Sequence, residues 1–140
     1  MTQKEIIKGN RLIANFMGLK IKEPKGYTLN KDGSENCWMV FPKKYDNWDF
    51  PEMVRESEID RYLKFHNNWT WLMSVVDKIE TLSHVMQTSL KMDMSHSYSF
   101  NIIWYRKYTT QDRCYKSKII AVYSVVVEFL NWYINYNNKE

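Results

Sequence analysis

The clearest alternation of hydrophobic and polar positions lies between residues 86 and 104. In residues 86–94 the odd positions are polar, and most even positions hold Met or Leu, which is the two-residue period of a strand with one buried face. Residues 98–104 repeat the pattern, with large side chains at the even positions Tyr98, Phe100, Ile102 and Trp104. The two runs predict an antiparallel hairpin whose even-numbered side chains face a helix.

Three other stretches carry apolar residues at the three- and four-residue steps of a helix buried on one side. The first is residues 6–17, after which Gly18 stands where helices commonly end. The second is residues 69–82, with Asn67 or Asn68 as its N-cap, and the third is residues 118–136, with Ser117 as its N-cap. The third helix is the longest apolar element.

The remaining segments have weaker patterns. Residues 27–29 and 37–41 flank an Asp32-Gly33 turn, and we expect them to form a loose hairpin. Residues 43–67 are charged and aromatic and resemble an insertion, within which residues 53–65 could form a short helix. Together the elements predict an α+β fold, an antiparallel sheet of about four strands packed with helices in the order α-β-β-α-β-β-α.

Length and composition indicate one globular domain over residues 1–140. A chain of 140 residues that is 44% hydrophobic, with 4 Gly and 3 Pro, is typical of a folded domain and not of a disordered or low-complexity segment. Its longest apolar run, residues 125–130, contains Glu128, so we expect no membrane span. Two distant cysteines and the absence of a secretory signal favour a cytoplasmic location.

Three segments together resemble a known family. They read NRLIANFMG at residues 10–18, NWTWLMSVVDKIE at residues 68–80 and VVEFLNWY at residues 126–133. As a set they are similar to short bacteriophage and prophage proteins, especially of Bacteroidetes, that are related to the phage ABA-sandwich domain. The resemblance spans the chain and implies an α/β sandwich with an accessory role in the host cell. It implies no catalytic residues.

The motifs that define common enzyme chemistries are missing from the sequence. It contains neither a Gly-x-Gly-x-x-Gly nor a Walker-type loop, and its three histidines, His66, His84 and His96, are isolated, so we expect no cofactor and no metal. An acidic cluster invites a metal-dependent nuclease or phosphoesterase interpretation and comprises Glu52, Glu56, Glu58 and Asp60. Because Arg and Lys alternate with these carboxylates, a salt-bridged helix face is the favoured interpretation.

The most informative feature is a basic and aromatic segment at residues 104–118. Five cations against the single carboxylate of Asp112 give a surplus of four positive charges, equal to the formal net charge of +4 of the whole chain. The segment also leads into the last predicted helix, whose N-terminus attracts anions. The predicted ligand-binding residues are Tyr105, Arg106, Lys107, Tyr108, Arg113, Tyr115, Lys116, Ser117 and Lys118. The alternative is a solubilising loop that balances acidic residues between positions 46 and 60.

These features favour a non-enzymatic binding protein. Its expected partner is a host protein or a small anionic, nucleotide-like ligand, which an anti-defence factor would occupy or sequester. The first alternative is a nucleic-acid-binding module that uses residues 104–118, and the second is the metal-dependent enzyme. Of the aromatic residues, we expect one or two tryptophans to be exposed and able to stack on a ligand or anchor a partner, from the set Trp38, Trp48, Trp69, Trp71 and Trp132.

Overall fold

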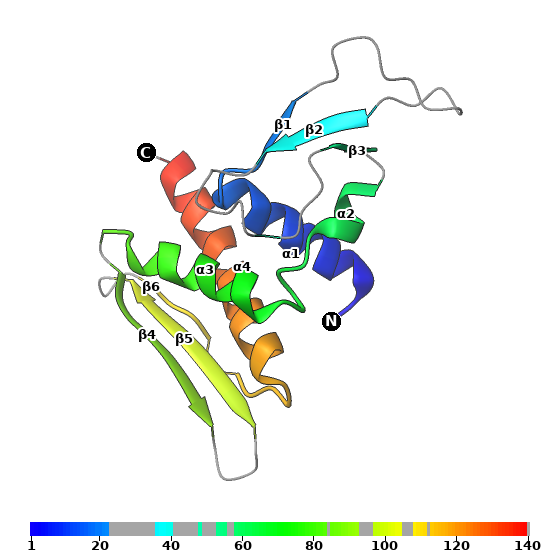
Figure 1. The fold of residues 1–140 in the computed structure, drawn as a ribbon. Coiled ribbons are helices and arrows are strands. Elements are labelled where there is room, and N and C mark those ends of the chain that lie inside the picture. Colours follow the sequence, from blue (N-terminus) through cyan, green and yellow to red (C-terminus); the bar gives the residue numbers. More distant parts are fainter. Residues whose placement is uncertain are drawn as a thin grey trace. The chain divides into compact units, whose positions relative to one another are not determined.

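The computed structural model describes residues 1–22, 36–40, 48, 53–55, 58–83, 85–92, 97–104, 108–111 and 113–139 (Figure 1). The described residues form helices and antiparallel strands, which confirms the predicted α+β class. By their contacts they divide into two compact units, Met1–Lys64 and Phe65–Glu140.

The first unit begins with α1, Gln3–Phe16, the helix predicted over residues 6–17. Thr2 starts it three residues earlier than the apolar pattern does, because its hydroxyl accepts the Glu5 N–H at 3.2 Å while the Glu5 carboxylate accepts the Thr2 N–H at 2.6 Å. The hydrogen bond from the Thr2 backbone N–H to the Glu5 carboxylate also lowers the pKa of Glu5. The helix ends before Gly18, which has a φ of 87° that a residue with a Cβ adopts less readily.

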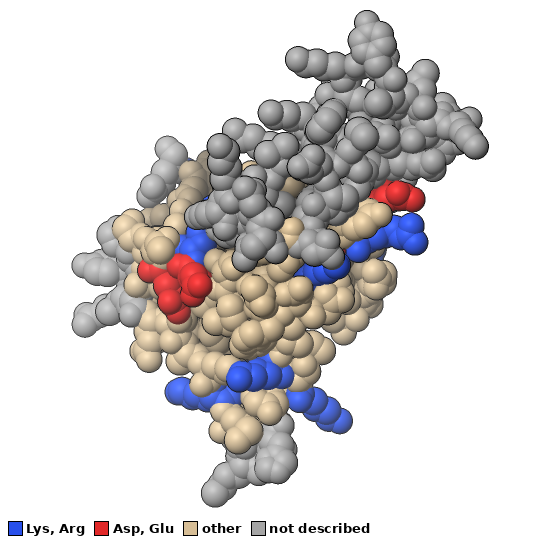
Figure 2. Space-filling model, viewed as in Figure 1, with Lys and Arg blue, Asp and Glu red and all other residues tan. Residues whose placement is uncertain are grey.

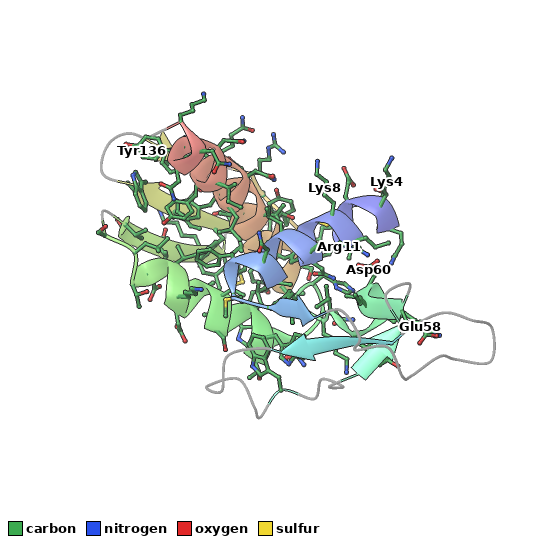
Figure 3. The ribbon with its side chains drawn as sticks, turned by 90° about the horizontal axis from the view of Figure 1, so that it is seen from above. Lys4, Lys8, Arg11, Glu58, Asp60 and Tyr136 are labelled. Atoms are coloured by element: carbon green, nitrogen blue, oxygen red, sulfur yellow. The ribbon has the colours of Figure 1, made fainter. Side chains whose placement is uncertain are left out.

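The short helix α2, Ile59–Tyr62, is joined to α1 by polar contacts. The guanidinium of Arg11 on α1 donates to both carboxylate oxygens of Asp60 at 2.8 and 3.0 Å, and Figure 3 shows these side chains meeting. The buried Asn10 amide donates to the Leu63 carbonyl at 2.9 Å. Ile13 is buried on the same helix. Among the described residues between 53 and 65, the predicted α-helix is present only at Ile59–Tyr62.

The strands of this unit are β1, Lys20–Lys22, β2, Asn36–Val40, and β3, Met53–Arg55, in the order β1-β2-β3 with antiparallel pairing. The backbone of residues 53–55 thus pairs with β2 and is not helical. Residues 27–29, the predicted partner of residues 37–41, lie outside the described residues.

The second unit contains α3, Trp69–Glu80, β4, Val85–Met92, β5, Tyr98–Trp104, β6, Tyr108–Thr109, and α4, Lys118–Asn138. The strands β4 and β5 form the predicted antiparallel hairpin, with Leu90 opposite Phe100. The sheet order is β4-β5-β6. Asn68 is the N-cap of α3, as predicted, and its side chain accepts the Trp71 N–H at 3.2 Å.

The core of this unit lies between β5 and α4. Phe100, Ile102 and Trp104 are buried on β5, as their even positions predict, and α4 packs on this strand. The Trp104 ring lies 5.9 Å from the Phe129 ring and 5.5 Å from the Tyr133 ring. Aromatic pairs at such distances add to the stability gained from burial alone.

Two further details differ from the sequence predictions. The described strands form two separate three-stranded sheets instead of one sheet of about four strands. The sequence pattern did not indicate β3 and β6 because strands of 3 and 2 residues are too short to show a two-residue period. Leu90 and Met92 on β4 are 37% and 63% exposed, although cross-strand pairing puts them on the same face as Phe100. The reason is that α4 packs on β5, whereas β4 contacts α3.

Among the described helices, α4 alone has the length and hydropathy of a possible membrane span. A helix at the centre of a protein core has the same length and composition. Seven residues of α4 are buried here, including Val122, Val126 and Phe129.

Candidate functional site

The basic segment is fixed to the sheet just before it enters α4. Tyr115 and Tyr98, at the start of β5, exchange two backbone hydrogen bonds of 2.7 and 2.8 Å. Arg113 and Lys116 lie on either side of this anchor and are exposed. Figure 2 shows basic side chains along the lower part of the visible face, where the chain enters α4 in Figure 1.

An exposed tryptophan from another helix adjoins this segment. The ammonium of Lys118, in the first turn of α4, lies 5.3 Å from the centre of the Trp69 ring in the first turn of α3. The Trp69 residue is 38% exposed. A cation over an indole face is an attractive contact, and it holds the Lys118 charge beside a flat aromatic surface.

The N-terminus of α4 lacks the side-chain cap that the other long helices have. Ser117 is in the N-cap position as predicted, but its hydroxyl makes no capping hydrogen bond, and the first turn of α4 has no acidic residue. Asn68 and Thr2 do cap α3 and α1. The positive end of the 21-residue α4 dipole is therefore not offset by its own first turn.

The Glu128 carboxylate binds the backbone of the basic segment. Glu128, on α4, accepts the backbone N–H of Gln111 at 2.9 Å. The Gln111 side chain in turn accepts a hydrogen bond from the Arg113 guanidinium. These contacts orient Arg113 and leave it exposed. We name the surface formed by Trp69, Arg113, Lys116, Ser117 and Lys118 the basic-aromatic surface.

The structure describes only part of the predicted ligand-binding set. Arg113, Tyr115, Lys116, Ser117 and Lys118 lie along the segment described above. Only the backbone of Tyr108 is described, where it pairs with Trp104. Tyr105, Arg106 and Lys107 lie outside the described residues.

The tryptophans sort by exposure. Trp48 and Trp71 are buried at 6% and 3%, and Trp132 is half-buried, which leaves Trp69 as the exposed one among those whose side chains are described. Its position next to Lys118 could not be inferred from the sequence, because the two residues are far apart along the chain. Only the backbone of Trp38 is described, as part of β2.

The acidic cluster does not come together as a metal site in the described part of the chain. Asp60 is bound by Arg11, and Glu58 lies 3.5 Å from the Arg61 guanidinium. Glu52 and Glu56 are outside the described residues, and within those residues no three His, Cys, Asp or Glu side chains are grouped as metal ligands.

Of the histidines, His66 is described and packs edge-on against Tyr123, with 6.2 Å between ring centres. Burial lowers the pKa of His66 and raises that of Tyr123. Both shifts favour the neutral forms and follow from packing.

Comparison with models of known protein families, with curated proteins and with solved structures gave no match. The resemblance to phage proteins and the functions it implies therefore stay predictions.

Proposed function

We propose that this protein is a non-enzymatic binding protein that takes a phosphate-containing, nucleotide-like ligand on its basic-aromatic surface. The observation that carries the proposal is the contact of Lys118 with the exposed Trp69 ring beside the uncapped N-terminus of α4. It combines in one place a fixed cation, a flat ring and backbone N–H groups of a helix end.

Each part suits one part of a nucleotide. Arg113 and Lys116 are exposed and offer charge-assisted hydrogen bonds to phosphate oxygens, and the α4 N-terminus adds N–H donors and a favourable dipole. The indole of Trp69 can stack on a base, and such stacking is worth about 1–3 kcal/mol per base. A ligand with both a base and phosphates uses the surface fully.

The biological role follows from the resemblance to phage accessory proteins. An anti-defence factor of this kind sequesters a nucleotide-like signal or occupies a host protein in the cytoplasm. The resemblance also favours a single α/β sandwich, and within the second unit the packing of α4 on β5 is consistent with a helix layer on a sheet. Nucleic-acid binding through the same basic residues is the alternative.

The experiment is calorimetric titration with three probes: adenosine triphosphate, inorganic triphosphate and a short single-stranded oligonucleotide. The double variant Arg113→Glu, Lys116→Glu should abolish binding of adenosine triphosphate and of inorganic triphosphate. Trp69→Ala should weaken adenosine triphosphate about 5- to 150-fold, the equivalent of 1–3 kcal/mol, and leave inorganic triphosphate unchanged. Lys8→Glu, a reversal of an exposed lysine on α1, is the matched control and should have no effect.

Other results would change the proposal. Preference for the oligonucleotide, with affinity that falls steeply as salt rises, would establish the nucleic-acid alternative. Adenosine triphosphate binding that survives the charge reversal would rule out the basic-aromatic surface as the site. Hydrolysis of any probe with Mg²⁺ would contradict a non-enzymatic role.

A further inference from the structure

Among the described strands, β4 is the outer strand of its sheet, and its outer edge has no described partner. It is the first strand in the order β4-β5-β6 and pairs with β5 along Val85–Met92. No residue in the described part of the chain pairs with its other side, and Figure 1 draws it at the margin of its sheet. An open strand of this length can serve as a template for another strand.

The hydrogen bonds of β5 establish which backbone groups of β4 point outward. Tyr98 exchanges its backbone bonds with Tyr115, and Ile102 binds Thr110, accepting its N–H at 3.2 Å and donating to its hydroxyl at 2.9 Å. The even positions of β5 therefore direct their polar groups away from β4. In an antiparallel pair, opposed residues either both direct their N–H and C=O groups toward each other or both direct them away from each other. Thr88, Leu90 and Met92, which lie opposite Ile102, Phe100 and Tyr98, therefore direct these groups away from β5, to the outer edge of β4.

The same residues carry exposed apolar side chains. Leu90 is 37% and Met92 is 63% exposed, and both lie on the face that packs against α4 further along the sheet. Edge strands are usually protected by charges or prolines. The only charge on β4 is Lys91, which alternation places on the opposite face.

We propose that two copies of this chain form a dimer by antiparallel pairing of their β4 strands about Leu90. In this register Leu90 lies opposite Leu90 of the second copy, and Thr88 opposite its Met92. The outward N–H and C=O groups of these residues then pair in about six hydrogen bonds. The pairing joins the two sheets across one symmetric interface.

Self-complementarity is what favours a second copy over an unrelated peptide. The register about Leu90 matches the outward positions of one strand with those of the other and covers both exposed apolar side chains. It also places Lys91 opposite Ser89, so that the two lysines are apart, whereas a register about Lys91 would set like charges directly against each other. No other partner chemistry is needed.

The test is the molar mass of the full chain in solution, measured by light scattering during gel filtration. The expected mass is about 34 kDa, twice the 17.0 kDa of one chain. Leu90→Lys and Leu90→Glu should each halve the mass, and an equimolar mixture of the two should restore the dimer, because opposite charges then meet across the interface. Asn135→Lys and Asn135→Glu, at an exposed position on α4, are the matched controls and should leave the mass doubled.

A second measurement does not depend on how the charged variants fold. Leu90→Cys, in a chain with Cys37→Ser and Cys114→Ser, should form an intermolecular disulfide when the two thiols are oxidised by dissolved oxygen, because hydrogen-bonded antiparallel partners have Cα atoms about 5.5 Å apart, within disulfide range. Ile120→Cys, an exposed control on α4, should not form one. A wild-type mass of 17.0 kDa, or a dimer that persists in both charged variants, would overturn the proposal. So would an absence of cross-linking through Leu90→Cys.

Discussion

Truncation of Ile102 is the most direct test of the packing between β5 and α4. The side chain is fully buried, at 0% exposure, on the face of β5 that α4 covers. Ile102→Ala removes three buried carbon atoms, at about 0.8 kcal/mol of transfer free energy each, or about 2.4 kcal/mol. The cavity left behind raises the total into the range of about 2–5 kcal/mol that buried Ile or Leu truncations cost.

The chain offers a control with the same chemistry. Ile120→Ala removes the same atoms from a residue on α4 that is 42% exposed, and alanine favours the helix, so its cost should stay below about 1 kcal/mol. Denaturant unfolding followed by far-ultraviolet circular dichroism, at one protein concentration, gives both values. Equal losses at the two positions, or a loss below about 0.5 kcal/mol at Ile102, would refute the packing described here.

Three further predictions concern capping, pH and a buried amide. Asn68→Ala should lower the free energy of unfolding by about 0.5–2 kcal/mol because Asn68 caps α3, whereas Ser117→Ala should cost much less, since Ser117 makes no capping bond; equal costs in denaturant unfolding would contradict the capping difference. Burial lowers the pKa of His66 below its ordinary 6.5, so the folded protein binds this proton less readily than the unfolded chain. The stability contribution is present above pH 6.5 and lost as pH falls through the lowered folded pKa. The melting temperature should therefore fall less between pH 7 and pH 5 in His66→Gln than in the wild type, and an equal fall in both proteins would contradict this prediction. Asn10→Ala should cost about 1–3 kcal/mol in the same unfolding assay because it leaves the buried Leu63 carbonyl without its donor, and a neutral result would show that this bond is dispensable.

Regular elements with long periodic patterns were the most predictable. The strand Tyr98–Trp104 has the bounds that its alternation indicates, and α3 begins right after the Asn68 cap. Both follow from local chemistry: the side-chain period of a strand in the first case and a hydrogen bond at the helix end in the second.

What the sequence could not predict depends on contacts between distant or very short segments. Two-residue β6 has no pattern of its own and is held by its partner β5. The exposure of Met92 depends on which strand α4 covers, and the meeting of Trp69 with Lys118 depends on how α3 and α4 are placed within their unit. Charge density identified the basic segment, but only the fold supplies the ring beside it.

The lengths of chain between bonded partners imply an order of folding. In the second unit the Ile102–Thr110 bond spans 8 residues and the Gln111–Glu128 bond spans 17, whereas the Asn10–Leu63 bond of the first unit spans 53. The entropy cost of loop closure grows with the logarithm of loop length, so closing 53 residues costs about 1.6 kcal/mol more than closing 8. Contacts of β5 should therefore form early after dilution from denaturant. Amides at the junction of α1 with Leu63 should become protected from hydrogen exchange at a later time in refolding.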